Sequence, residues 1–282
     1  SGLVNTFGPM GDGERTLVGG FTLELIETMY QRGYLGPEVT PDYWITHYNR
    51  WIPFQPEPLK RLLDEYCVNA GVEIRYFTRL IDAEVTGHKV DGAIISSIEG
   101  LQCIKAKAYI DATGDAVLAA ASGVPCKVAG RDWPFQPATV CSTFSGINWD
   151  DPAYTTNRGT DAVREKVKNE YLPKANADGH FSHPDHFIAG MKKVGNVTGN
   201  LNGGHIYNLD GLSTKSLSEG MIWGRKLAAE YMEFYLKYVP GCERIELAAT
   251  SPVMGIRDTR RIVGEWCSRL DGQSVRRHVR RS

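Results

Sequence analysis

The chain has 282 residues, of which 42% are hydrophobic and 23% charged, and its formal net charge is −1 at pH 7. This composition is typical of a globular protein that buries a sizeable core, and the nearly balanced charge gives no basis for a nucleic-acid or anionic-membrane partner. The longest apolar stretches are also too short to span a membrane.

The spacing of the cysteines is evidence about the cellular compartment of the protein. The six cysteines are scattered, and no two of them form a C-x-x-C pair. This spacing favours reduced thiols over a disulfide framework or a zinc site. We therefore expect a cytoplasmic location. Because the chain begins at Ser1 rather than at methionine, an upstream leader stays an open alternative.

The first part of the chain predicts two amphipathic helices joined by an aromatic loop. Apolar residues recur at helical spacing over 17–32 and again over 56–70, and the loop between them spans 34–54. Gly19 and Gly20 lie in the first turn of the first helix. They allow the backbone there to lie against a flat ligand or, equally, to pack tightly against a neighbouring strand.

Strand patterns follow. Residues 72–77, 80–86, 90–98 and 101–111 each read as a strand, with turn residues between them. A helix, a strand, a short meander and a further strand predict an α/β unit with an antiparallel insert.

The stretch from Ile104 to Gly123 predicts a strand, a turn and a helix. Its alternating apolar residues break at Asp111 and continue as an alanine-rich helical segment. Gly114 lets a backbone approach a ligand closely, and a helix start offers unpaired N–H groups to an anion such as a pyrophosphate. A strand that simply turns into a helix gives the same pattern.

The middle of the chain differs in character and predicts a second domain or large insertion. It contains a strand over 139–144, a polar helix over 161–171 and loops rich in Asn, Gly and His. A long helix follows over 216–238, where Ser216 and Glu219 have the spacing of a capping box.

Together these segments resemble the FAD-dependent oxidoreductases of the glutathione-reductase-like flavoprotein superfamily. The resemblance rests on the ordered recurrence of PEPLKRLLDEYCVNAGVEIRYFT, YIDATGDAVLAAASG, and EGMIWGRKLAAEYMEFYLKYVPGCE followed by GIRDTRRIVGE, and it covers about residues 1–265. It implies a partial FAD/NAD(P)-binding, Rossmann-like α/β domain over 1–125 with the meander as an insert. An α+β substrate domain over 126–255 and a return segment with an Arg-rich tail over 256–282 would follow.

The resemblance also implies FAD as cofactor and a set of residues that contact it. The backbone from Thr78 to Leu80 would lie near the adenine, and Gly19 and Gly20 near the edge of the flavin ring. The ADP side would be lined by Ala112, Thr113, Gly114 and Asp115.

Three side chains are candidates for catalysis. Arg257 and Arg260 can stabilise charge that develops on a flavin carbonyl or a substrate carboxylate, because an arginine fork binds such groups with two parallel hydrogen bonds. A salt-bridged loop with Asp258 and Glu265 is the alternative. His205 lies in a glycine-flanked segment and can act as a proton donor, or merely bond backbone.

A run of three histidines does not predict a metal site. His180, His183 and His186 have H-x-x-H-x-x-H spacing, but Pro184 breaks helical geometry and no cysteine ligand is near. We expect no metal.

Two features depart from the family. No initial strand with a G-x-G-x-x-G turn is present, and the arginine-rich tail after Glu265 resembles no flavin-contacting element. Our hypothesis is that the chain is an incomplete reading of a longer flavoprotein, truncated at both ends. We expect the chain by itself to bind FAD weakly or not at all.

The expected function is an FAD-dependent oxidoreductase that moves a hydride or two electrons between flavin and a small organic substrate. One alternative is a catalytically silent sugar- or small-ligand-binding module that uses the 34–54 loop and the Asn-rich 196–208 loop. Another is a structural subunit that a second chain completes. The sequence leaves the oligomeric state open.

Overall fold

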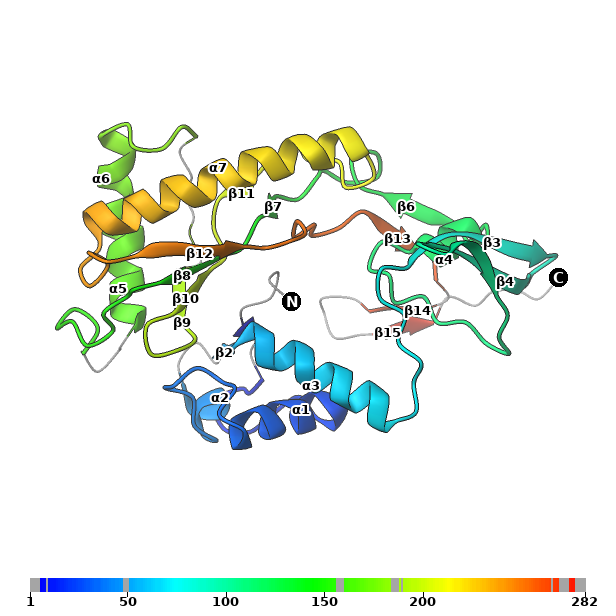
Figure 1. Ribbon diagram of the computed structural model, residues 1–282, viewed down its shortest axis with the longest axis horizontal. Coiled ribbons are helices and arrows are strands. Elements are labelled where there is room, and N and C mark those ends of the chain that lie inside the picture. The colour runs from blue at the N-terminus through cyan, green and yellow to red at the C-terminus, as the bar shows by residue number, and fades with distance from the viewer. Residues whose placement is uncertain are drawn as a thin grey trace. The chain divides into compact units, whose positions relative to one another are not determined.

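The computed structural model describes residues 6–8, 10–47, 51–155, 160–183, 188, 190–264, 266–268 and 274–276 (Figure 1). The chain forms two compact units. Unit 1 contains residues 1–73, 137–209 and 213–256, and unit 2 contains residues 74–136, 210–212 and 257–282. This division groups the first helices with the expected substrate domain.

The N-terminal part of unit 1 is a small helical block with its own core. The core contains Ile26 and Met29 from the first long helix, Leu62 from the second, and the loop residue Phe54, all fully buried or nearly so. The predicted amphipathic stripes therefore do bury one face of each helix. The elements are β1 (Thr6–Phe7), α1 (Gly20–Gln31), α2 (Tyr43–Thr46), β2 (Ile52–Pro53) and α3 (Pro56–Asn69).

The rest of unit 1 is built on a four-stranded antiparallel sheet in the order β12-β8-β10-β9. A long helix, α7, packs its aromatic row (Tyr231, Phe234, Tyr235) into the same core as Phe144 of the sheet. The strands are β8 (Ser142–Ser145), β9 (Met191–Lys193), β10 (Gly199–Leu201) and β12 (Glu246–Thr250), with a smaller pair of β7 (Ala138–Thr139) and β11 (His205–Ile206). The helices are α5 (Thr160–Lys166), the π-helical η1 (Val167–Tyr171), α6 (Leu172–Ala177) and α7 (Thr214–Tyr238).

The start of α7 corrects one prediction. The N-cap is Ser213, whose hydroxyl accepts a hydrogen bond from the Ser216 N–H at 3.3 Å. Ser216 therefore lies inside the first turn. The sequence offers a serine at both positions, and either one satisfies the capping rule until the helix start is known.

Unit 2 contains the predicted meander. Its three strands pair in order and antiparallel, and the helix α4 packs on β3. The elements are β3 (Arg79–Thr86), β4 (Lys89–Ser97), β5 (Gly100–Ile104), α4 (Val117–Ala121), β6 (Cys126–Val128), β13 (Arg260–Ile262), β14 (Trp266–Ser268) and β15 (Ser274–Arg276). β13 pairs with β6 and β14 with β15, both antiparallel.

Two of the predicted strands are wrong. Residues 72–77 form no strand, and the strand expected over 101–111 ends at Ile104. Apolar alternation makes a strand only where a neighbour completes the ladder of hydrogen bonds. The side chains of Phe77 and Ile110 are 97% and 91% exposed, so alternation there does not mark a buried face of this unit.

The fold is mixed α/β, as expected, and every named strand pair among the described residues is antiparallel. The parallel, Rossmann-like part of the expectation stays a prediction. Within the described ranges, no helix combines the length and the apolar character that crossing a bilayer requires.

Candidate functional site

The four-stranded sheet of unit 1 has one apolar and one polar face. Phe144 and Met191 enter the core beneath α7. Thr143, Asn200 and Lys192 stand directly opposite one another on β8, β10 and β9. Because residues paired across antiparallel strands share a face, these three side chains form one row on the face away from α7.

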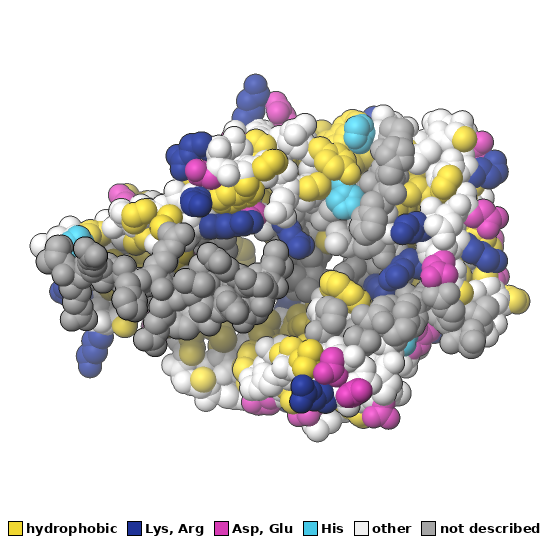
Figure 2. Space-filling model, turned by 180° about the vertical axis from the view of Figure 1, so that it is seen from behind, with side chains coloured by type: hydrophobic (Ala, Val, Ile, Leu, Met, Phe, Trp, Pro, Cys, Tyr) yellow, Lys and Arg dark blue, Asp and Glu magenta, His cyan; other side chains and the backbone are white. Residues whose placement is uncertain are grey.

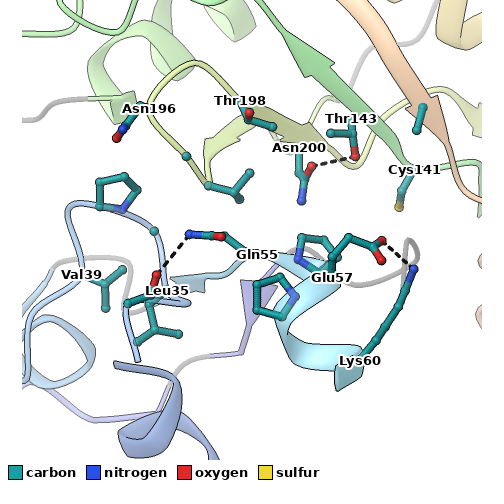
Figure 3. A pocket seen from close by; sticks show the side chains of 18 of the residues that line it. Leu35, Val39, Gln55, Glu57, Lys60, Cys141, Thr143, Asn196, Thr198 and Asn200 are labelled. Atoms are coloured by element: carbon teal, nitrogen blue, oxygen red, sulfur yellow. Dashed lines mark hydrogen bonds and ion pairs between the residues drawn. The ribbon is translucent and has the colours of Figure 1, made fainter. Parts of the chain in front are cut away.

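A cavity of about 910 Å³ opens on this polar row (Figure 3). On the sheet side, the Thr143 hydroxyl donates to Asn200 Oδ1 at 2.9 Å, and the Asn200 side chain is buried. On the opposite side, Gln55 Nε2 donates to the Gly33 carbonyl at 3.2 Å. The remaining lining mixes apolar and polar groups, including Leu35, Val39, Lys60, Asn196 and Ser251. This mixture suits a small organic molecule.

Cys141 also faces this cavity. Its Sγ atom lies 3.8 Å from Asn202 Oδ1, and burial raises the pKa of the thiol. The side chain therefore stays protonated at neutral pH and is a poor nucleophile. The site does not offer thiolate chemistry at this position.

The corner at residues 111–115 in unit 2 caps its own helix. Asp111 Oδ2 accepts from the Ala119 N–H and Asp111 Oδ1 from the Thr113 N–H and hydroxyl, while Thr113 Oγ1 accepts from the Val117 N–H. The expectation that the helix start offers unpaired N–H groups is not met at Val117 and Ala119. Ala112, Thr113 and Gly114 are exposed, so their backbone is accessible.

The same corner is joined to the return segment. The Thr259 hydroxyl donates to Asp115 Oδ1 at 2.7 Å, and Arg260 Nη1 donates to the Asp115 carbonyl at 3.2 Å. Thr259 is buried, and Arg260 is half-buried at the start of β13. Two regions singled out in the sequence, the corner and the arginine segment, thus meet in unit 2.

The other predicted residues are divided between the two units. Leu80 is in β3, on which α4 packs, and Thr78 directly precedes that strand. Arg257 is exposed and pairs with no residue that the structure describes. His205 belongs to unit 1, where its ring centroid lies 6.2 Å from that of Tyr207, and it does not line the cavity on the polar face.

Gly19 and Gly20, also in unit 1, leave the start of α1 open. Gly19 is the N-cap without a side-chain cap, and a Cβ at either glycine would meet nothing within 4 Å. No side chain of the described residues caps the first N–H groups of α1, which leaves them available to an acceptor.

The histidine run forms no metal site in the described residues. His180 Nε2 lies 3.0 Å from the Glu230 carbonyl, and His186 falls outside those residues. No cluster of three potential ligands occurs where side chains are described.

Comparison with known proteins decides the family. The family model for FAD dependent oxidoreductases matches residues 1–278. The chain belongs to this family. Its members use FAD, so FAD is the cofactor of this chain's family. No curated protein matched the chain.

One solved structure similar to this flavoprotein chain is that of the flavin-dependent brominase Bmp2, as a triple mutant, at 14% sequence identity and a TM-score of 0.43. The match covers 89% of the present chain and 58% of the brominase chain. The chain thus spans less than two thirds of the length of that protein.

The described residues fit parts of FAD. The open start of α1 offers N–H donors suited to a flavin carbonyl, and the exposed backbone at 112–114 is accessible to a ribose or an adenine ring. The first turn of α4 does not fit the diphosphate, because its N–H groups are bonded to Asp111 and Thr113.

Sequence reasoning missed the polar row. Lys192 and Asn200 come from strands of three residues, too short for a periodic signal. Thr143 lies in the strand expected over 139–144, but its partner strands could not be identified from the sequence. The signal that the sequence does offer is the Asn-rich composition of the 196–208 loop, which the alternative function uses for ligand binding.

Proposed function

We propose that this flavoprotein moves a hydride or two electrons between FAD and a small organic substrate bound in the cavity on the polar face of the unit 1 sheet. The observation that carries the proposal is this cavity of about 910 Å³, in which a buried, oriented amide meets an apolar wall. FAD, when bound, supplies the hydride chemistry itself. The chain's residues bind and orient.

The site residues have separate tasks in this proposal. The Thr143 hydroxyl fixes the Asn200 amide, so that its NH₂ group can donate to a substrate oxygen. Gly19, Gly20, Thr78, Leu80 and residues 112–115 would hold FAD. Arg257 and Arg260 would stabilise negative charge on the flavin. His205 does not line the cavity, so this proposal gives it no task at the substrate.

A second candidate function uses the same cavity. The 34–54 loop contributes Leu35 and Val39 to it, and the 196–208 loop contributes Asn196, Thr198 and Asn200. These are the two loops expected of a catalytically silent sugar- or small-ligand-binding module. Such a module needs the cavity but no flavin reaction.

Anaerobic flavin reduction distinguishes the two functions. The chain, saturated with added FAD, is mixed with panels of alcohols, hydroxy acids and amines while the visible absorbance of oxidised flavin is followed. The proposal expects at least one panel member to reduce the flavin with saturation, and Asn200→Leu to weaken the saturation. Binding of a sugar or other ligand that Asn200→Leu abolishes, with no panel member reducing the flavin, would favour the silent module.

A further inference from the structure

A second cavity of unit 1, of about 360 Å³, lies beside the same polar row, and its charged lining residues are mostly cations. Three cations, Arg164, Lys168 and Lys192, line it with a single carboxylate, Glu165. Its other polar lining residues are Thr6, Asn169 and Asn202. A cavity with this excess of positive charge attracts an anion.

Lys192 is the unusual member of this group. It lies in the middle of β9 and is 8% exposed. A buried ammonium group is costly unless negative charge or hydrogen-bond acceptors compensate it. Lys192 stands opposite Asn200, which lines the larger cavity, so the polar row connects the two cavities. Asn202, directly after β10, also lines the smaller cavity.

The local structure holds Arg164 at this cavity. Gly190, with a φ of +87°, leaves the space that the Arg164 side chain fills, since a Cβ at residue 190 would collide with its Cγ and Cδ atoms. Lys168 follows Arg164 by four residues, across the junction of α5 and η1, so both side chains emerge on one face. On the face drawn in Figure 2, Lys and Arg side chains lie interspersed with Asp and Glu side chains.

The cavity also has an apolar wall, made by Trp51 and Ile188. Arg164, Glu165, Lys192 and Trp51 each keep interactions within the chain, so a ligand would add to these contacts. An apolar wall beside cations suits a small organic acid with a flat apolar body. The arginine fork and the ammonium groups would bind its carboxylate, and the indole would pack against its apolar body.

We propose that this cavity is the carboxylate subsite of the substrate site, so that the substrate class is small organic acids with a flat apolar body. The inference rests on the proposed function, which it deepens by naming the substrate class. Its chemistry is the binding of one carboxylate, with no bond made or broken.

Calorimetric binding of benzoate and of its neutral analogue benzamide to the full chain tests the subsite. Both are titrated at one ionic strength and without added FAD. We expect benzoate to bind at least about tenfold more tightly than benzamide, and Lys192→Met and Lys168→Met each to weaken benzoate binding about tenfold. The matched control is Lys215→Met, which removes an exposed lysine of α7 paired only with Glu219 and should leave the affinity unchanged.

Lys168 is exposed, so Lys168→Met keeps the test valid if Lys192→Met fails to fold. The subsite is refuted if benzoate does not bind, if benzamide binds equally well, if Lys168→Met keeps the affinity, or if inorganic phosphate displaces benzoate with equal affinity. The measurement needs no flavin reaction. If benzoate does not bind but a neutral substrate still reduces the flavin, the subsite is refuted and the proposed function stands. If benzoate binds but no substrate reduces the flavin, only the proposed function is contradicted.

Discussion

The Thr259 hydroxyl and the Asp115 carboxylate, 144 positions apart in the chain, form a hydrogen bond of 2.7 Å inside unit 2. The neighbouring Arg260 reinforces the junction through the Asp115 carbonyl. The return segment thereby holds Asp115, the residue that follows the exposed turn at 112–114. A ligand that contacts the turn would meet a backbone already held in place, which lowers the entropy lost on binding.

Thr259→Val should destabilise unit 2. Thr259 is 2% exposed, and valine keeps its shape while removing the donor to Asp115. We expect the free energy of unfolding to fall by about 1–3 kcal/mol, the cost of leaving a half-buried polar group without its partner. Urea denaturation followed by circular dichroism measures the change.

The matched control for Thr259 is Thr78→Val. Its hydroxyl donates only to the carbonyl of Tyr76, two residues earlier, so the loss should stay below about 0.5 kcal/mol. The double variant Asp115→Ala/Thr259→Val should lose less than the sum of its single variants. Strict additivity would show that the two side chains do not act as a pair.

Asp111 should make the stability of the corner depend on acid pH. Burial raises the pKa of the Asp111 carboxyl, but hydrogen bonds from the Ala119 N–H and from Thr113 together lower it by more. The pKa in the folded chain therefore lies below the ordinary value. The carboxylate therefore stabilises the fold fully above about pH 4 and loses that effect as the pH falls through the folded pKa.

The check for Asp111 is the free energy of unfolding of Asp111→Asn against the unchanged chain over a pH series. We expect a deficit of about 0.5–2 kcal/mol for the variant near neutrality, the usual value of a helix cap, and a shrinking deficit below about pH 4. A deficit that is the same at every pH would mean that the carboxylate charge plays no part in capping α4.

The long helices were predictable because their apolar residues recur over several turns. The helices expected over 17–32, 56–70 and 216–238 are found as α1, α3 and α7, shifted by up to three residues at their ends. The meander was predictable from alternation and turn residues. The failures at 72–77 and 105–111 have one cause, since alternation describes a strand's own faces and says nothing about whether a partner strand lies beside it.

The site was predictable only in part. The corner and the arginine segment were identified from their residues, but their junction through Thr259 depends on how β13 pairs with β6. The polar row depends in the same way on register, because a shift of one residue in β10 would turn Asn200 into the core. Pairing between short, distant strands leaves no local signal in a single sequence.

Gly114→Ala tests the predicted cofactor contact at the corner. Gly114 has a φ of +80° and open space where a Cβ would be, so alanine strains the backbone without a collision. Gly87, in the β3–β4 turn of the same unit, has a φ of +62° and equally open space, which makes Gly87→Ala a matched control. Each variant should lose about 1 kcal/mol of stability.

Only Gly114→Ala should also weaken FAD binding, because only there would the added methyl group stand between backbone and cofactor. Titration of the flavin fluorescence with each variant gives the two affinities. Equal FAD affinity in both variants would remove Gly114 from the cofactor site. A stoichiometric flavin absorbance band in the purified chain would, separately, contradict the expectation that it binds FAD weakly on its own.

Thr143→Val tests the orienting hydrogen bond of the substrate cavity. Without the hydroxyl, Asn200 Oδ1 loses its 2.9 Å bond and the amide is free to turn its NH₂ group away from the cavity. With any substrate that reduces the flavin, we expect Thr143→Val to lower kcat/KM about tenfold, whereas Thr143→Ser, which keeps the hydroxyl, should retain most of it. Thr250→Val alters another threonine of the cavity wall and serves as a control for wall polarity alone. If Thr143→Ser and Thr143→Val lose activity equally, the methyl group's packing rather than the hydrogen bond positions the substrate, and Asn200 is then no more than part of the wall.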